Sequence, residues 1–206
     1  MAHGVRPDGA SVTPYTLRQH LIDMNACDDA VAWVGERRSL QKAWDECPRG
    51  DWLLWYAARA GADHKTVVMA ACACARLSLV HVPDGEDRPR LAIEAAEAWG
   101  RGDVGLDVVR AAAADAYAYA YAYADALSAA SSAYAAADAA YAAYAAYADA
   151  YAAADAAAYA AAYAAYAYAY AYADADADAA ADAATLAECA DIVRQHIPTP
   201  PTQDDQ

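Results

Sequence analysis

The second half of this 206-residue chain has little or no glycine, proline and positive charge. Neither Gly nor Pro occurs between Leu106 and Ile197. Residues 111–206 contain one basic residue, Arg194, against 13 acidic residues, a net charge of −12. Residues 1–110 contain 13 Lys and Arg against 16 Asp and Glu, a net charge of −3. A strongly negative field repels nucleic acid and anionic membranes and attracts basic proteins. We therefore expect a basic protein partner and no binding to nucleic acid.

Apolar segments without charge, long enough to cross a membrane, are also lacking. Asp interrupts the Ala-rich stretches every few residues, so they are too polar to span a bilayer. The number of cysteines is odd, and the chain shows no secretory signal peptide. We therefore expect a protein of the reducing cytoplasm, without disulfides and without membrane contact. The five cysteines are Cys27, Cys47, Cys72, Cys74 and Cys189.

Motifs of known catalytic and metal sites are lacking as well. The segment GRGDVG has neither the lysine nor the spacing of a phosphate-binding loop. No nucleophile elbow or ordered triad surrounds Ser78 and His81. Cys72 and Cys74 lie two residues apart on a predicted helix, so their thiols point about 160° apart and cannot clamp one metal ion. We expect packed core thiols, no catalytic residues, no cofactor and no metal.

Residues 10–110 predict a series of short helices rich in Trp. Asp51 is the predicted N-cap of one helix, and Gly61 stands where the glycine after a helix C-terminus belongs. Asp63 opens HKTVVMAACACARLSLVHV, which is apolar almost all round and predicts a central helix. A further helix is expected to end at Gly100. Its predicted inward-facing residues are Leu91, Ile93, Ala96 and Trp99.

Residues 111–184 consist of 46 Ala, 15 Tyr, 9 Asp, 3 Ser and 1 Leu. Alanine is the best helix former, which favours helices throughout. The alternation YAYAYAY at 117–123 and 166–172 is instead typical of a strand. Alanine at every second position, however, gives a sheet little side-chain area to pack. We therefore predict helices for this segment.

The tyrosines of this segment recur at helical spacing. We expect them to form ridges packed between helices, with flanking alanines that let the backbones approach and with the aspartates facing outward. A single helix of 74 residues would be roughly 110 Å long, so breaks are expected near 128–132, 149–155 and 173–174. Asp174 is the predicted start of the last helix, which Pro198 ends. The ridge residues are Tyr134, Tyr141, Tyr144, Tyr147, Tyr151, Tyr159, Tyr163, Tyr166 and Tyr170.

Four aspartates are the candidate partner-binding residues. On one continuous helix they would lie within about 40° of each other, opposite most of the tyrosines. One interpretation is a face that keeps an Ala- and Tyr-rich helix in solution. The other is an acidic stripe that docks a basic partner, for example the phosphate-binding cleft of a nuclease. The candidates are Asp138, Asp149, Asp174 and Asp178.

Three stretches, AWDECPRGDWLLWYAARAG, ACACARLSLVHVPDGEDRPRLAIEAAEAWGRGDV and TLAECADIVRQHIP, carry a family resemblance. With the Ala/Asp/Tyr segment between the last two, they resemble an immunity protein family of bacterial polymorphic toxin systems, which also occurs in actinobacterial and phage genomes. The resemblance covers about residues 40–198. It implies an all-helical protein that binds and neutralises a toxin without catalysis, and it supplies no functional residues. The Tyr-Ala alternation is longer here than expected of the family.

We therefore predict an all-α protein, a multi-helix bundle with long Ala/Tyr-rich helices in its C-terminal half. Residues 1–198 are expected to form one domain, with a Trp-rich half (10–110) and an acidic half (111–198), before a disordered tail (199–206). The expected function is stoichiometric occlusion of a basic protein, such as a toxin or a nuclease. The alternative is self-assembly into a homo-oligomer or filament through the Tyr/Ala seams.

Overall fold

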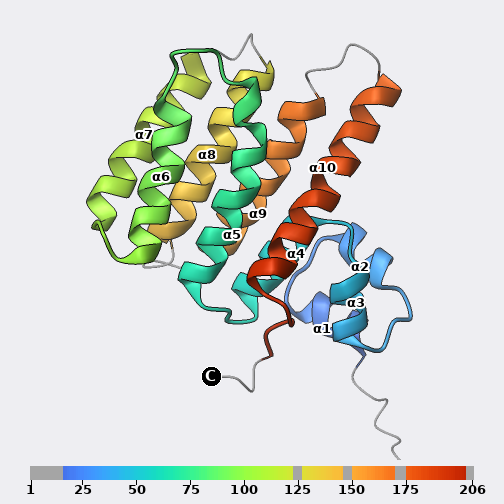
Figure 1. The fold of residues 1–206 in the computed structure, drawn as a ribbon. Helices are drawn as coiled ribbons and strands as arrows, with labels where there is room; N and C mark the ends of the chain where they lie inside the picture. The colour runs from blue at the N-terminus through green and yellow to red at the C-terminus, as the bar shows by residue number, and fades with distance from the viewer. Residues whose placement is uncertain (1–15, 123–126, 146–149, 170–174, 203–206) are drawn as a thin grey trace, which may run out of the picture. The chain divides into compact units, whose positions relative to one another are not determined.

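The computed structural model describes residues 16–122, 127–145, 150–169 and 175–202. All regular secondary structure in these ranges is helical, which confirms the predicted all-α multi-helix class (Figure 1). By their contacts the residues divide into two compact units, 1–40 and 41–206.

In the smaller unit, α1 (Leu17–Asp23) packs against α2 (Asp28–Val34). The Thr16 hydroxyl caps α1 by accepting a hydrogen bond from the Gln19 backbone N–H at 3.2 Å. Asn25 has a positive φ of 60° directly after the helix, a conformation that Asn adopts more readily than most residues. The two helices bury a small apolar set: Leu21, Met24, Ala30, Val31 and Val34.

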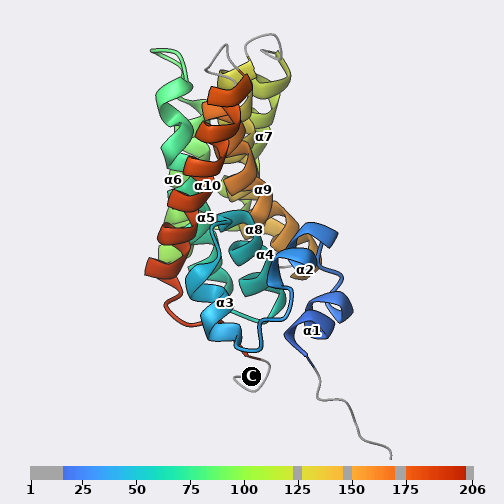
Figure 2. The same ribbon diagram turned by 90° about the vertical axis from the view of Figure 1, so that its right-hand side faces the viewer.

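The larger unit contains the remaining helices, of which α5 to α10 run side by side (Figures 1 and 2). As predicted, α5 is central, since it contacts α4, α6, α8, α9 and α10; α8 is central too, between α5, α6, α7 and α9. Helix α6 packs on α7 and α8, so the body continues across residue 110. The bounds are α3 (Leu40–Glu46), α4 (Gly50–Arg59), α5 (His64–Leu77), η1 (Ser78–His81), α6 (Arg88–Arg101), α7 (Leu106–Ala122), α8 (Leu127–Ala145), α9 (Ala150–Ala169) and α10 (Ala175–His196).

Two predicted helix ends between α4 and α5 are confirmed. Gly61 has φ +87°, and the Ala62 N–H reaches back to the Ala57 carbonyl at 2.9 Å, the bond pattern of a glycine-terminated helix. The Asp63 carboxylate caps α5 by accepting from the Thr66 N–H at 2.9 Å. The predicted cap of α4 is wrong, because Asp51 lies inside the first turn and its carboxylate accepts from the Arg49 guanidinium.

The predicted end of α6 at Gly100 is also wrong. The helix continues to Arg101, and Gly102 ends it with φ +86°. Gly100 faces α5 instead, where a Cβ added to it would lie 3.0 Å from the Met69 sulfur. Of the predicted inward-facing residues, Ile93 and Ala96 are buried, Trp99 is half-buried and Leu91 is exposed.

The Ala-rich segment forms several packed helices, not one rod. The starts of α9 at Ala150 and α10 at Ala175 agree with the predicted breaks. Helix α8 likewise starts at Leu127, one residue before the break predicted near 128–132, and residues 128–132 and 150–155 are themselves helical. Ser132 is buried there, and its hydroxyl donates to the Ser78 carbonyl at 2.8 Å, so it joins α8 to η1.

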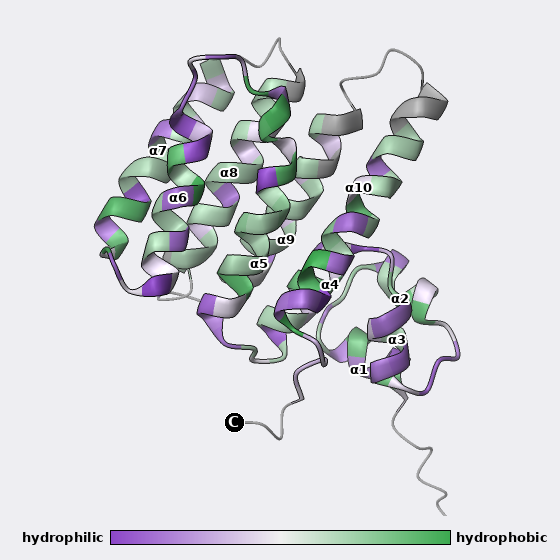
Figure 3. Cartoon of the chain, viewed as in Figure 1, coloured by the Kyte–Doolittle hydropathy of each residue, from purple (hydrophilic) through white to green (hydrophobic). Residues whose placement is uncertain are grey.

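Alanine fills most of the interior positions of α8 and α9 whose side chains the structure describes. Fourteen alanines of these two helices are almost wholly enclosed, and the moderate hydropathy of alanine runs along both (Figure 3). Methyl side chains let the helix backbones approach closely and exclude water with few voids. The fourteen are Ala133, Ala135, Ala136, Ala137, Ala139, Ala140, Ala143, Ala157, Ala160, Ala161, Ala164, Ala167 and, at 1 % exposure, Ala142 and Ala145.

The C-terminal end of α10 is held by α3 and by the segment that joins α3 to α4. The Arg194 guanidinium donates to the carbonyls of Trp44 (3.1 Å) and Cys47 (2.8 Å), and the Trp44 indole donates to the Ile197 carbonyl (3.2 Å). Of the tail predicted at 199–206, residues 199–202 have no regular secondary structure and Pro200 is buried, while 203–206 lie outside the described residues.

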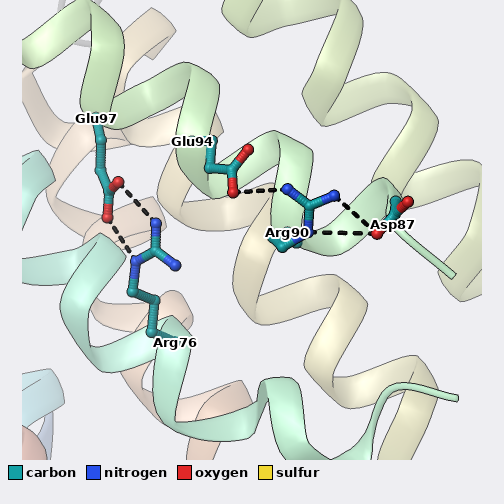
Figure 4. A network of polar contacts seen from close by, with 5 residues as sticks. All are labelled: Arg76, Asp87, Arg90, Glu94 and Glu97. Carbon is teal, nitrogen blue, oxygen red and sulfur yellow. Dashed lines mark hydrogen bonds and ion pairs between the residues drawn. The ribbon is translucent and has the colours of Figure 1, made fainter. Parts of the chain in front are cut away.

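Ion pairs on the surface of α5 and α6 account for three acidic residues and two arginines (Figure 4). Arg76 of α5 makes a two-pronged pair with Glu97 of α6, both bonds 2.7 Å long. Arg90 bridges Asp87 (2.8 Å) and Glu94 (2.7 Å) along α6. Because Glu94 and Glu97 are bound to arginines, they serve here as structural ion pairs on the helix surface.

Candidate functional site

Six tyrosines from α7, α8 and α9 form a connected set of rings, which we call the tyrosine face. Tyr134 of α8 is its centre: its ring centroid lies 6.2 Å from that of Tyr117, 5.6 Å from Tyr121 and 5.2 Å from Tyr163. Tyr163 of α9 lies 6.2 Å from Tyr159 and 6.0 Å from Tyr166. The members are Tyr117, Tyr121, Tyr134, Tyr159, Tyr163 and Tyr166.

This face is open to solvent. Tyr121 is 71 % exposed, Tyr159 57 % and Tyr166 46 %, while the other three members are half-buried. The predicted ridges between helices are therefore found in part: Tyr134 and Tyr163 are half-buried and stack between α8 and α9, whereas Tyr141, Tyr159 and Tyr166 are exposed. Tyr147 and Tyr170, and the side chains of Tyr144 and Tyr151, lie outside what the structure describes. Tyr119 of α7, which is not part of the tyrosine face, is almost wholly buried, at 1 % exposure.

Asp138 of α8 lies beneath the tyrosine face. It is 7 % exposed, and its carboxylate accepts a hydrogen bond from the Tyr117 hydroxyl of α7. The predicted place of Asp138 on an acidic exterior is therefore wrong. A wheel of one continuous helix places Asp138 opposite most of the tyrosines, whereas its burial depends on a phenol from another helix. The residue joins α7 to α8 through a polar bond inside an otherwise apolar contact.

Burial shifts the pKa values of Asp138 and of the tyrosines around it. It raises the pKa of Asp138 from 3.8 to about 6, although the hydrogen bond from Tyr117 acts in the opposite direction. Burial, and next the negative charge of Asp138, raise the pKa of Tyr117 far above its usual range. Burial and the same charge also raise the pKa of Tyr134 and Tyr163. At neutral pH the site therefore holds neutral phenols over a carboxylate that is largely ionised.

The other candidate aspartates are not placed by the structure. Asp149 and Asp174 lie outside the described residues, and so does the side chain of Asp178. The acidic stripe they were expected to form with Asp138 stays a prediction. Within the described part of the Ala-rich segment, Asp115 of α7 and Asp155 of α9 are exposed.

The cysteines are packed thiols where the larger unit contains them. Cys72 and Cys74 point to different helices, as predicted: Cys72 Sγ donates to the Ile93 carbonyl of α6 (3.9 Å) and Cys74 Sγ to the Cys189 carbonyl of α10 (3.8 Å). Burial raises the pKa of Cys72 and, to about 11, that of Cys47. In the described residues no three His, Cys, Asp or Glu side chains gather closely enough to hold a metal ion.

The spacing of the tyrosines along the chain predicts part of the tyrosine face. Tyr117 and Tyr121 are four residues apart, and Tyr159, Tyr163 and Tyr166 follow at four and three, so each set shares one side of its helix. Spacing does not say which side of a helix meets solvent. That choice depends on which neighbouring helices also present alanine.

Comparison of the chain with protein-family models, with curated proteins and with solved structures finds no match. Among the described residues, no helix is both long enough and apolar enough to cross a membrane.

Proposed function

We propose that this protein is a non-catalytic binding protein that occludes a basic protein partner through the tyrosine face, in the role of an immunity or inhibitor protein. The observation that carries the proposal is the exposure of a connected row of tyrosine rings across three helices. Tyrosine is enriched at protein interfaces because it brings a large rigid contact area with a polar end. Contiguous exposed aromatic surface on a folded chain marks such an interface.

The charge around this face favours a partner rich in arginine or lysine. Residues 111–206 carry a net charge of −12, and their single basic residue, Arg194, is bound to the carbonyls of Trp44 and Cys47. A cation placed over a tyrosine ring is stabilised by about 0.5–2 kcal/mol, more when water is excluded. Asp138 beneath the rings adds negative potential at the same place. Partner cations would therefore meet both the ring faces and the field of the acidic half.

The test is co-purification from the native host with tagged protein. Two variants are compared with the wild type. The triple variant is Tyr121→Ser/Tyr159→Ser/Tyr166→Ser, and the matched control is Val80→Ser, which alters an exposed apolar residue of η1 outside the tyrosine face. We expect the wild type and the control to retain one basic protein and the triple variant to lose it. The measured affinity should fall steeply between low and physiological salt. Recovery of the same partner by the triple variant would contradict the proposal.

Self-assembly through the same rings is the second candidate, and the exposed tyrosine face also favours it. Two copies of this chain repel each other, because each carries a net charge of −15. Salt therefore distinguishes the two candidates: screening strengthens self-association and weakens binding of a basic partner. Light scattering of the purified protein across a salt series decides between them. A mass that rises with salt in the wild type, but not in the triple variant, supports assembly.

A further inference from the structure

A surface hollow lies between α6 and the first turns of α7, which are neighbours in the fold (Figure 1). Its volume is about 450 Å³, within the range of small-molecule sites. Its apolar part consists of Leu91 and Val108, which are 47 % and 45 % exposed, together with Ala111 and Ala112. Because both aliphatic side chains are half-exposed beside a concave surface, a ligand with an apolar body that covers them would gain binding free energy from the hydrophobic effect.

Two carboxylates stand at this hollow, Asp107 and Asp115 of α7. They are eight residues apart, which corresponds to roughly 12 Å along a helix axis, so one small cation cannot contact both. Both are exposed, and neither forms an ion pair with any of the described residues. The one cationic lining residue, Arg88, is paired with Glu86 (2.7 Å) and stacks over the Tyr119 ring (4.8 Å). The hollow therefore presents two separated negative charges and an apolar strip.

We propose that this hollow binds a linear aliphatic polyamine. Its ammonium groups pair with Asp107 and Asp115, and its methylene chain lies along Leu91, Val108 and the alanines between them. The ligand class follows from the arrangement: two negative charges separated by an apolar strip complement two positive charges separated by methylenes. The site lies on the α6 side of α7 and does not depend on the proposed role of the tyrosine face.

Other small ligands match the hollow less well. A divalent metal ion is compact and strongly hydrated, and it would reach one carboxylate without using the apolar strip. A monoamine satisfies one carboxylate only. An anion is repelled by both. Because exposed ion pairs contribute little, a polyamine should bind with a dissociation constant of about a millimolar at low ionic strength.

The experiment is an NMR titration of the full chain with putrescine, spermidine and spermine, and with hexylamine and Mg²⁺ as controls. Putrescine is too short to bridge the two carboxylates, whereas spermidine and spermine are long enough. We expect spermidine and spermine to bind about tenfold more tightly than putrescine or hexylamine, with shifted amide signals confined to 88–91 and 107–115. Mg²⁺ at equal ionic strength should not reproduce these shifts.

Variants separate the two parts of the hollow. Asp107→Asn/Asp115→Asn should lose about tenfold or more in spermidine affinity and should abolish the advantage of long polyamines. Leu91→Ser/Val108→Ser should lose several-fold while the salt dependence is unchanged. Asp155→Asn, an exposed carboxylate of α9, is the matched control and should bind as the wild type does. Equal binding by the double Asn variant, or equal shifts with Mg²⁺, would overturn the proposal. These results leave the test of the tyrosine face unaffected.

Discussion

The two halves of the larger unit are packed by different means. Residues 41–105 build their core from large side chains, among them Trp44, Leu54 and Ile93, which are almost wholly enclosed. Residues 106–197 build theirs mainly from alanines of α8 and α9 that touch across closely spaced backbones. The packing of the first half therefore depends on large side chains that fill the core, and the packing of the second half depends on small side chains. Both halves nevertheless meet in one body, since α4 and α5 pack directly on α9 and α10.

Aromatic residues are used differently in the two halves as well. In the first half the half-buried rings of Trp52 and Trp55 are covered by the chain's own arginines, at 4.6 Å for Arg49 and 5.3 Å for Arg59. The second half has two basic residues, Arg110 and Arg194, and in its tyrosine face the rings of Tyr121, Tyr159 and Tyr166 are exposed. An alanine core leaves large residues free for the surface. That freedom is the structural basis of the proposed binding function.

Removing side-chain volume from the core of residues 41–105 should have the largest effect on stability. Leu54 is fully buried in α4, so Leu54→Ala leaves a cavity and should lower the free energy of unfolding by about 3–4 kcal/mol. Leu91→Ala is the matched control, because this leucine is exposed on α6, and it should cost less than about 1 kcal/mol. Urea denaturation of both variants measures the difference. Equal losses would show that burial does not distinguish these leucines.

Adding one methyl group where the halves touch should be almost as damaging. A Cβ on Gly50 would lie 2.4 Å from the Cys189 Cβ and 2.7 Å from the Ala190 backbone nitrogen, so α4 and α10 would have to separate. Gly50→Ala should therefore lower the free energy of unfolding by about 3 kcal/mol. In Gly100→Ala the new Cβ meets only the flexible end of Met69, and the gain in helix propensity offsets the contact. A destabilised control with a stable Gly50→Ala would reverse the expected order.

Enlarging a side chain within the alanine seam tests the second half directly. Ala136 of α8 is fully enclosed, so Ala136→Leu should lower the free energy of unfolding by about 2 kcal/mol through overpacking. Ala118→Leu, at an exposed position of α7, is the control and should change it by less than about 0.5 kcal/mol. The same urea measurements apply. If α8 accepts leucine at 136 without loss, the seam is not closely packed.

The buried carboxylate should make stability depend on pH. The folded-state pKa of Asp138 is about 6 and its ordinary value is 3.8, so the folded protein binds this proton more tightly than the unfolded chain does. Lowering the pH from 7 to 5 should therefore raise the contribution of Asp138 to the free energy of unfolding by about 1 kcal/mol. Asp138→Asn should remove that part of the pH dependence, whereas Asp155→Asn, an exposed aspartate, should keep it. Identical profiles for all three proteins would contradict the assignment.

The sequence correctly predicts that the secondary structure is helical, and it correctly predicts several helix ends. Gly61 and Asp63 are recognisable because a left-handed glycine and a side-chain cap are local features. The repulsion among aspartates near 174 similarly indicates the start of α10, which begins at Ala175. The errors arise where tertiary contacts decide. Ser132 is helical and is bound to η1, and α6 continues past Gly100.

The side of each helix that is buried could not be predicted from the Ala-rich segment. A wheel places Tyr159, Tyr163 and Tyr166 together, but alanine flanks them on both sides, so hydrophobicity alone favours burying the rings. The structure buries the alanines because the neighbouring helices also present alanine and can approach closely. The burial of Asp138 depends in the same way on Tyr117, a residue 21 positions away on another helix.

The central claim is that alanines hold this bundle together and that the tyrosine face is free to bind. Its most direct test is the free energy of unfolding of Tyr121→Ser/Tyr159→Ser/Tyr166→Ser, measured by urea denaturation against the wild type. Because these rings are largely exposed, we expect a total loss of less than about 1 kcal/mol and an unchanged helical circular dichroism spectrum. A loss of several kcal/mol, comparable to that of Leu54→Ala, would show that the tyrosines belong to the core and would contradict the claim.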